Sequence, residues 1–150
     1  MSQVRQIDVP PDSLLAQFGD ETSYRDCFAR NVPGIVTLPQ LIERFYGSVV
    51  FAPERAVLGL LGKPVSSAAA ENLASGTAEC FGVWKVVGRR QDQILLESKG
   101  TGTASWLSVQ RGKDETRLLF GSWVGNIGQS GWRALLKAHL WYSRALLGGV

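Results

Sequence analysis

His139, Tyr142 and Ser143 are the residues whose types and spacing come closest to a constellation that could do chemistry. His139 is the single histidine, and the other two follow at i+3 and i+4, on one face of a helix. A neutral imidazole in an apolar setting can act as a general base or orient a polar ligand head, because desolvation lowers its pKa. A core histidine bonded to a strand carbonyl is the commoner explanation of such a residue. His139 is therefore a candidate catalytic residue, and all three are candidate ligand-binding residues.

Trp84, Trp106 and Trp123 complete the candidate ligand-binding set, since each lies in a segment that alternates apolar and polar side chains. Large aromatic rings on a concave sheet can wall an apolar pocket and offer their N–H groups to a ligand. Ordinary core packing explains the same residues. Alternation alone does not decide which face of a sheet each ring occupies.

Other motifs point away from phosphate, metal and redox chemistry. The glycine-rich run Gly100–Thr103 leads into a predicted strand, whereas a phosphate-binding loop needs a helix N-terminus behind it. Cys27 and Cys80 lack metal-ligand spacing and are interpreted as buried thiols of a reducing compartment. We therefore predict neither a metal site nor a cofactor.

The elements that must position these residues are mainly strands. Apolar alternation with a period of two predicts them in the segments Tyr24–Val32, Cys80–Arg89, Gln93–Lys99, Thr103–Gln110 and Thr116–Val124. The last four follow one another with short turns, and a parallel connection would need a crossover of about a dozen residues or more. The sequence therefore predicts an antiparallel meander.

Helical spacing predicts three short helices after the first strand and one long helix at the end. The first covers Leu38–Tyr46 and begins with a capping box formed by Thr37 and Gln40, and the others cover Pro53–Leu61 and Ala68–Ala74. The last helix, Ser130–Leu147, has one basic stripe and one broad apolar side, which we expect to pack on the sheet. The predicted fold is α+β: an antiparallel meander wrapped around a long C-terminal helix, with short helices inserted after the first strand.

This order of elements resembles the START-like superfamily, also called the SRPBCC or Bet v 1-like helix-grip fold, and is similar to its bacterial members. The resemblance covers most of residues 24–147, notably Val83–Val86, Arg117–Ser122 and Trp132–Leu147. It implies a sheet that grips the last helix around an apolar cavity, and it carries over no common catalytic set. The family's usual sheet has more strands than the five predicted here, which implies a truncated sheet and a small or filled cavity.

Composition sets the remaining expectations. The 150 residues predict one domain over 23–150, preceded by a loosely ordered arm over 1–22. No apolar run reaches the ~20 residues of a membrane span, and the start lacks the apolar stretch of a secretory signal, so we expect a soluble, cytoplasmic protein. The net charge of +3 is too small an excess to indicate nucleic acid.

Three functions follow as hypotheses. The first is a binding module that holds a small hydrophobic or amphipathic ligand, such as a lipid, between the sheet and the C-terminal helix. The second is a cyclase-, aromatase- or hydratase-like enzyme that uses the same cavity with His139 as base; lacking a second acid or base, it ranks below the first. The third is a homo-oligomeric interaction protein, a homodimer for example, whose apolar surface at Leu140 and Trp141 docks a partner without a ligand.

Overall fold

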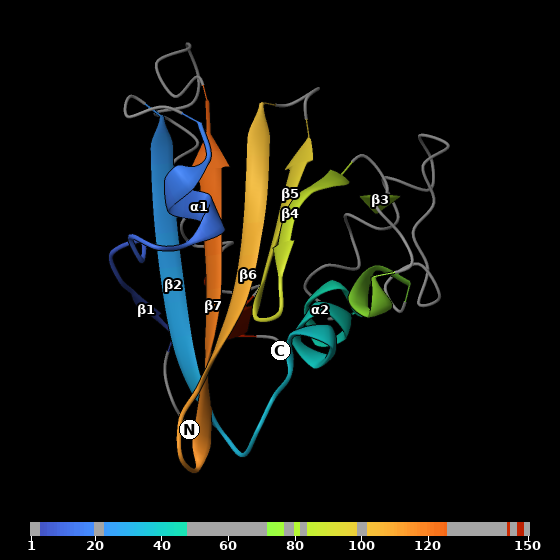
Figure 1. Cartoon of the computed structure of the whole chain (residues 1–150). Coiled ribbons are helices and arrows are strands. Elements are labelled where there is room, and N and C mark those ends of the chain that lie inside the picture. The colour runs from blue at the N-terminus through green and yellow to red at the C-terminus, as the bar shows by residue number, and fades with distance from the viewer. Residues whose placement is uncertain are drawn as a thin grey trace.

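The computed structural model describes residues 4–19, 23–47, 72–76, 80–81, 84–98, 102–125, 144 and 147–148. Their dominant element is one seven-stranded sheet in the order β1-β2-β7-β6-β5-β4-β3, antiparallel at every pairing (Figure 1). The strands are β1 (Arg5–Gln6), β2 (Tyr24–Pro33), β3 (Cys80–Phe81), β4 (Trp84–Arg90), β5 (Gln93–Ser98), β6 (Thr103–Arg111) and β7 (Glu115–Val124). The helices are α1 (Leu14–Gln17) and α2 (Leu38–Gly47), and residues 72–75 add a helical turn.

The predicted meander is present, but the predicted fold class is wrong. The described residues form mostly antiparallel sheet with short helices, and no long C-terminal helix is found among them. Of the segment Ser130–Leu147, only Arg144 and Leu147 belong to the described part of the chain. The prediction of a sheet wrapped around the last helix rested on helical spacing. Such spacing shows which side of a segment can be buried, but it does not show what that side packs against. Among the described residues, α2 supplies most of the helical side chains in the core that covers one face of the sheet.

The strand count also differs from the five predicted. The segment Cys80–Arg89 contains two strands that pair with each other, Cys80 opposite Lys85 and Phe81 opposite Trp84. A reversal of the chain inside an alternating segment does not disturb the alternation, so the pattern reads as one strand. The other addition, β1, is only two residues long and carries no period.

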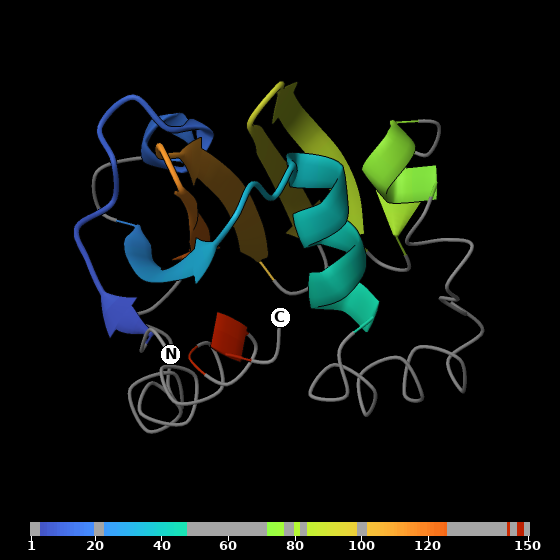
Figure 2. The ribbon, with the colours of Figure 1, turned by 90° about the horizontal axis from the view of Figure 1, so that it is seen from below.

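The first face of the sheet is covered by α2, as Figure 2 shows. The predicted capping box is confirmed: the Thr37 N–H donates to Gln40 Oε1 at 3.0 Å, and the Gln40 N–H donates to Thr37 Oγ1 at 3.4 Å. Leu41 and Ile42 are fully buried, and the ring of Phe45 lies 4.8 Å from that of Phe120 on β7. The apolar side of α2 therefore builds the core on this face.

The second face is covered by the N-terminal residues, on the opposite side of the sheet from α2. In the segment expected to be a loosely ordered arm, β1 pairs with β2, and the Ile7 N–H donates to the Cys27 carbonyl at 2.9 Å. Ser13 caps α1 by accepting from the Ala16 N–H at 3.0 Å. A helix of four residues cannot stand alone, and burial of Leu15 contributes about 1.5–3 kcal/mol toward holding it on the sheet.

Two layers of core therefore lie on the two faces of one sheet. The strands reflect this in continuous buried apolar runs, Ile94–Leu96 in β5 and Leu118–Phe120 in β7, where a sheet with one wet face would alternate. Within the described ranges, every helix falls short of the length and apolar character that a membrane crossing requires.

Candidate functional site

The structure places the predicted tryptophans on two different faces of the sheet. Trp84 packs at the edge of the first-face core, whereas Trp106 and Trp123 belong to the second-face core. The register places Trp106 and Trp123 on the same face. Trp106 pairs with Gly121 and Trp123 pairs with Ala104, and residues that pair, or that lie two apart in one strand, project on the same side of the sheet. These three rings therefore do not wall one pocket. The candidates His139, Tyr142 and Ser143 lie outside the described residues, and their roles stay predictions.

Trp106 and Trp123 differ in what their indole N–H groups meet. Trp106 is 1% exposed, and its Nε1–H donates to Gln93 Oε1 at 3.1 Å. Trp123 packs edge-on against Phe18 with ring centroids 4.8 Å apart, and its buried Nε1 has no hydrogen-bond partner in the described part of the chain. Trp106 is thus anchored, while Trp123 is held by packing.

A hollow on the first face, which we call the α2 hollow, lies where the start of α2 meets the end of β6. Its volume is about 530 Å³, within the range of small-molecule sites. Its apolar lining is Leu38, Pro39 and Val109, and its polar lining is Thr37, Gln91, Asp92, Gln110 and Arg111. The β4–β5 turn is fixed on one side, because the Val109 N–H donates to the Asp92 carbonyl at 3.1 Å.

The charged groups around the α2 hollow favour an acidic ligand group. Arg111 is exposed, and its guanidinium has no hydrogen bond or ion pair with any described residue. The N-terminus of α2, at Thr37 and Leu38, adds the positive end of the helix dipole to the same rim. Asp92 is the one carboxylate in the lining and stands at the β4–β5 turn.

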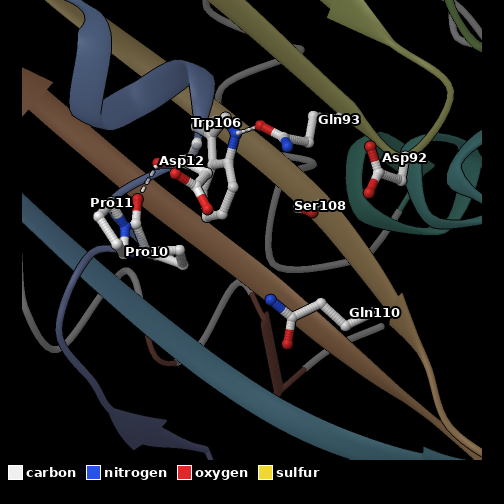
Figure 3. Close-up of a pocket in the computed structure, with 9 residues that line it drawn as sticks. Pro10, Pro11, Asp12, Asp92, Gln93, Trp106, Ser108 and Gln110 are labelled. Carbon is white, nitrogen blue, oxygen red and sulfur yellow. Dashed lines mark hydrogen bonds between the residues drawn. The ribbon is translucent and has the colours of Figure 1, made fainter.

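A second hollow, which we call the arm hollow, lies on the other face between the N-terminal turn Pro10–Ser13 and the sheet (Figure 3). Its volume is about 170 Å³. Below the turn it is lined by Asp92, Gln93, Trp106, Ser108 and Gln110. Of the predicted site residues that the structure describes, Trp106 alone lines either hollow.

The arm hollow was not predicted from the sequence because its roof comes from the segment that was expected to be loosely ordered. The available signal was the run Pro10-Pro11-Asp12-Ser13, which combines turn residues with a helix N-cap. Ser13 is 2% exposed and donates from Oγ to the Pro10 carbonyl at 2.7 Å, which closes this turn.

The buried titratable groups sit near one another on β2. Asp26 is 3% exposed and accepts from Tyr24 Oη at 2.9 Å and from the Ser122 N–H at 3.2 Å. Burial and the charge of Asp26 raise the pKa of the Tyr24 hydroxyl above its ordinary value. The same two causes raise the pKa of the Cys27 thiol to about 12. Cys27 is fully buried in the second-face core, as predicted, and at neutral pH it is a protonated thiol and not a nucleophile.

Metal binding finds no support in the residues that the structure describes, since no three His, Cys, Asp or Glu side chains among them form a group that could hold an ion. Comparison of the chain with protein-family models, with curated proteins and with solved structures found no match. The resemblance to the START-like superfamily therefore stays a prediction.

Proposed function

We propose that this protein is a binding module for a small amphipathic molecule with an acidic group, and that the α2 hollow is its site. The observation that carries the proposal is the pairing of an apolar wall with an unpaired cation in a hollow of about 530 Å³. Leu38, Pro39 and Val109 would contact the apolar body of the ligand. Arg111 and the N-terminus of α2 would receive its anionic head.

Two features distinguish the α2 hollow from an ordinary depression of the protein surface and suit it to ligand binding. Val109 lies at the edge of the first-face core, so a ligand in the hollow would extend the core contact instead of starting a new one. The wall is also rigid, because the capping box fixes the start of α2 and a backbone hydrogen bond fixes the β4–β5 turn. A wall that is already ordered costs little further entropy when a ligand binds.

The test uses two fluorescent probes that differ in charge: the anionic 8-anilinonaphthalene-1-sulfonate and the neutral N-phenyl-1-naphthylamine. We expect saturable binding of the anionic probe, and roughly tenfold weaker binding after Arg111→Gln, because a charged hydrogen bond contributes about 1.5–3 kcal/mol. The neutral probe should bind both proteins equally. Lys113→Gln is the matched control, since it removes one positive charge from the neighbouring turn outside the hollow.

A second variant tests the apolar wall. Pro39 is exposed, so Pro39→Trp should fill the hollow without disturbing the core, and both probes should then lose binding. Equal binding of the anionic probe by the parent protein, Arg111→Gln and Pro39→Trp would remove the α2 hollow from consideration. Thermal melts of each variant separate loss of the site from loss of the fold.

Native mass spectrometry followed by organic extraction would identify the natural ligand directly. A stoichiometric adduct that extracts as an organic acid would support the proposal. A neutral lipid or a nitrogenous base in its place would contradict the assigned ligand class.

We also propose a cytoplasmic location, supported by the free thiol of Cys27. A reducing compartment is where unpaired cysteines are ordinarily kept as thiols.

A further inference from the structure

The arm hollow carries a separate inference, because it opens on the face of the sheet opposite to the main part of the α2 hollow. The two hollows share only Asp92 and Gln110, which stand at the end of the sheet where both faces meet. The arm hollow has Asp12 in its roof and Asp92 at its rim, and its lining contains no Lys or Arg among the described residues. The charged side chains in its lining are therefore negative, whereas Arg111 gives the α2 hollow a positive charge.

One side chain in this hollow, that of Ser108, has no hydrogen-bond partner among the described residues. Ser108 is 3% exposed, lines the hollow, and makes no hydrogen bond through its side chain with any described residue. Its hydroxyl is accessible from the hollow, since Ser108 Oγ is not one of the fully buried side-chain atoms that lack a partner, and a water or a ligand in the hollow can therefore bond to it. In Figure 3 Ser108 lies on β6 below Trp106, in the floor of the hollow.

The two carboxylates are available as well. Neither the Asp12 nor the Asp92 side chain has a hydrogen bond or ion pair with a described residue. Arg90 lies beside Asp12 in the fold, and its Nη1 donates to the Asp12 backbone carbonyl at 2.8 Å rather than to the carboxylate. Arg90 is also not part of the lining.

We propose that the arm hollow binds a small organic cation through an ammonium or guanidinium group, with Asp12 and Asp92 balancing its charge and Ser108 accepting a hydrogen bond. An ammonium or guanidinium is a donor only, and all three side chains can accept. A volume of about 170 Å³ corresponds to about six water molecules, which suits a ligand of a few non-hydrogen atoms. A metal ion fits less well, because no group of three ligating side chains is present in the described residues.

The roof of the hollow is fixed in advance, which favours binding. Ser13 Oγ closes the turn on the Pro10 carbonyl, and the Leu14 N–H donates to Gln93 Oε1 at 2.9 Å. The same oxygen accepts from Trp106 Nε1, so roof and floor share one acceptor. The indole N–H of Trp106 is therefore a reporter of events in the hollow.

The experiment titrates ¹⁵N-labelled full-length protein with n-butylammonium and methylguanidinium chlorides, with n-butanol as the neutral probe. We expect a saturable shift of the Trp106 indole resonance with both cations at roughly millimolar Kd, and none with n-butanol. Asp12→Asn and Asp92→Asn should each weaken binding of the cations about tenfold, and Ser108→Ala should weaken it several-fold. Asp114→Asn is the matched control, because Asp114 is exposed and lines neither hollow.

Three results would overturn this inference: an equal response to n-butanol, equal affinities in Asp12→Asn, Asp92→Asn and Asp114→Asn, or a response to Ca²⁺ with none to the organic cations. The anionic fluorescent probe provides an independent reading of the α2 hollow in the same samples. A protein that binds the cations and not the anionic probe would keep this inference and lose the proposed function.

Discussion

Gly121 lies directly beneath Leu15, so that a Cβ at Gly121 would fall 2.4 Å from Leu15 Cδ2. It would also fall 2.9 Å from the Asp26 backbone carbonyl oxygen, which cannot move without disturbing β2. A glycine in the middle of a strand ordinarily weakens the strand. Here its missing side chain is what allows α1 to reach the sheet.

Gly121→Ala should therefore lower the free energy of unfolding by about 1–3 kcal/mol, the usual cost of overpacking a core. Urea denaturation followed by circular dichroism measures this. Gly88→Ala is the comparison, because its Cβ would meet only the flexible end of Leu14, at 3.3 Å. If the two variants lost equal stability, the close approach of α1 would not be the cause.

Gln93→Met should release the N-terminal segment from the sheet. Its side-chain oxygen accepts from both the Leu14 N–H and Trp106 Nε1–H, and methionine offers a similar shape without that acceptor. Two donors would lose their partner, at about 1–3 kcal/mol for each that remains buried. Hydrogen exchange should become faster at the Leu14 amide and the Trp106 indole, and unchanged at the Leu41 amide in α2, which serves as the internal control.

Arg25→Met tests the other anchor of α1. Arg25 Nε donates to the Leu15 carbonyl at 3.1 Å, and Nη2 donates to the Phe18 carbonyl, so one guanidinium holds the end of the helix. Its removal should cost roughly 1–3 kcal/mol and make the segment after Leu15 more sensitive to limited proteolysis. Arg5→Met is the matched control, since Arg5 is exposed on β1. An unchanged cleavage pattern would show that packing alone holds α1.

Stability should fall at alkaline pH through Cys27. Burial raises the pKa of this thiol from 9.0 to about 12, so the folded state retains a proton that the unfolded state releases. This contribution to stability is fully present below pH 9 and is lost as the pH rises toward 12, at no more than about 1.4 kcal/mol per pH unit. Urea denaturation at pH 7, 9 and 10.5 should show the decline, and Cys27→Ala should reduce its slope. Tyr24 adds to the decline above pH 10.

Local patterns predicted several of these elements well. The capping box at Thr37 and Gln40, the apolar side of α2 and the burial of Cys27 all depend on side chains close in sequence, and the structure confirms them. The strands β2 and β5 to β7 lie close to their predicted bounds. Each of these strands has a clear run of apolar or alternating side chains, and turn residues mark where it begins or ends.

The predictions that failed concern features that are formed by segments far apart in the sequence. Continuous apolar runs such as Leu118–Phe120 indicate burial on both faces, yet nothing local to β7 shows that the second cover comes from Leu15. Asp26 carries a charge in the middle of the sheet and is buried because Tyr24 and the Ser122 backbone satisfy it, two partners that the local pattern around Asp26 does not identify. The arm hollow combines residues of three segments that lie far apart in the sequence, and no spacing rule joins Asp12 to Ser108.

The contact between Leu14 and Gln93 spans 79 residues and has a consequence for synthesis. A ribosome adding about 5–20 residues per second needs roughly 4 to 16 s to travel from the first partner to the second. During that interval the apolar side chain of Leu15 has no sheet on which to dock. The nascent N-terminal segment therefore stays undocked until the strands of the sheet have been made, and slower translation would prolong its exposure.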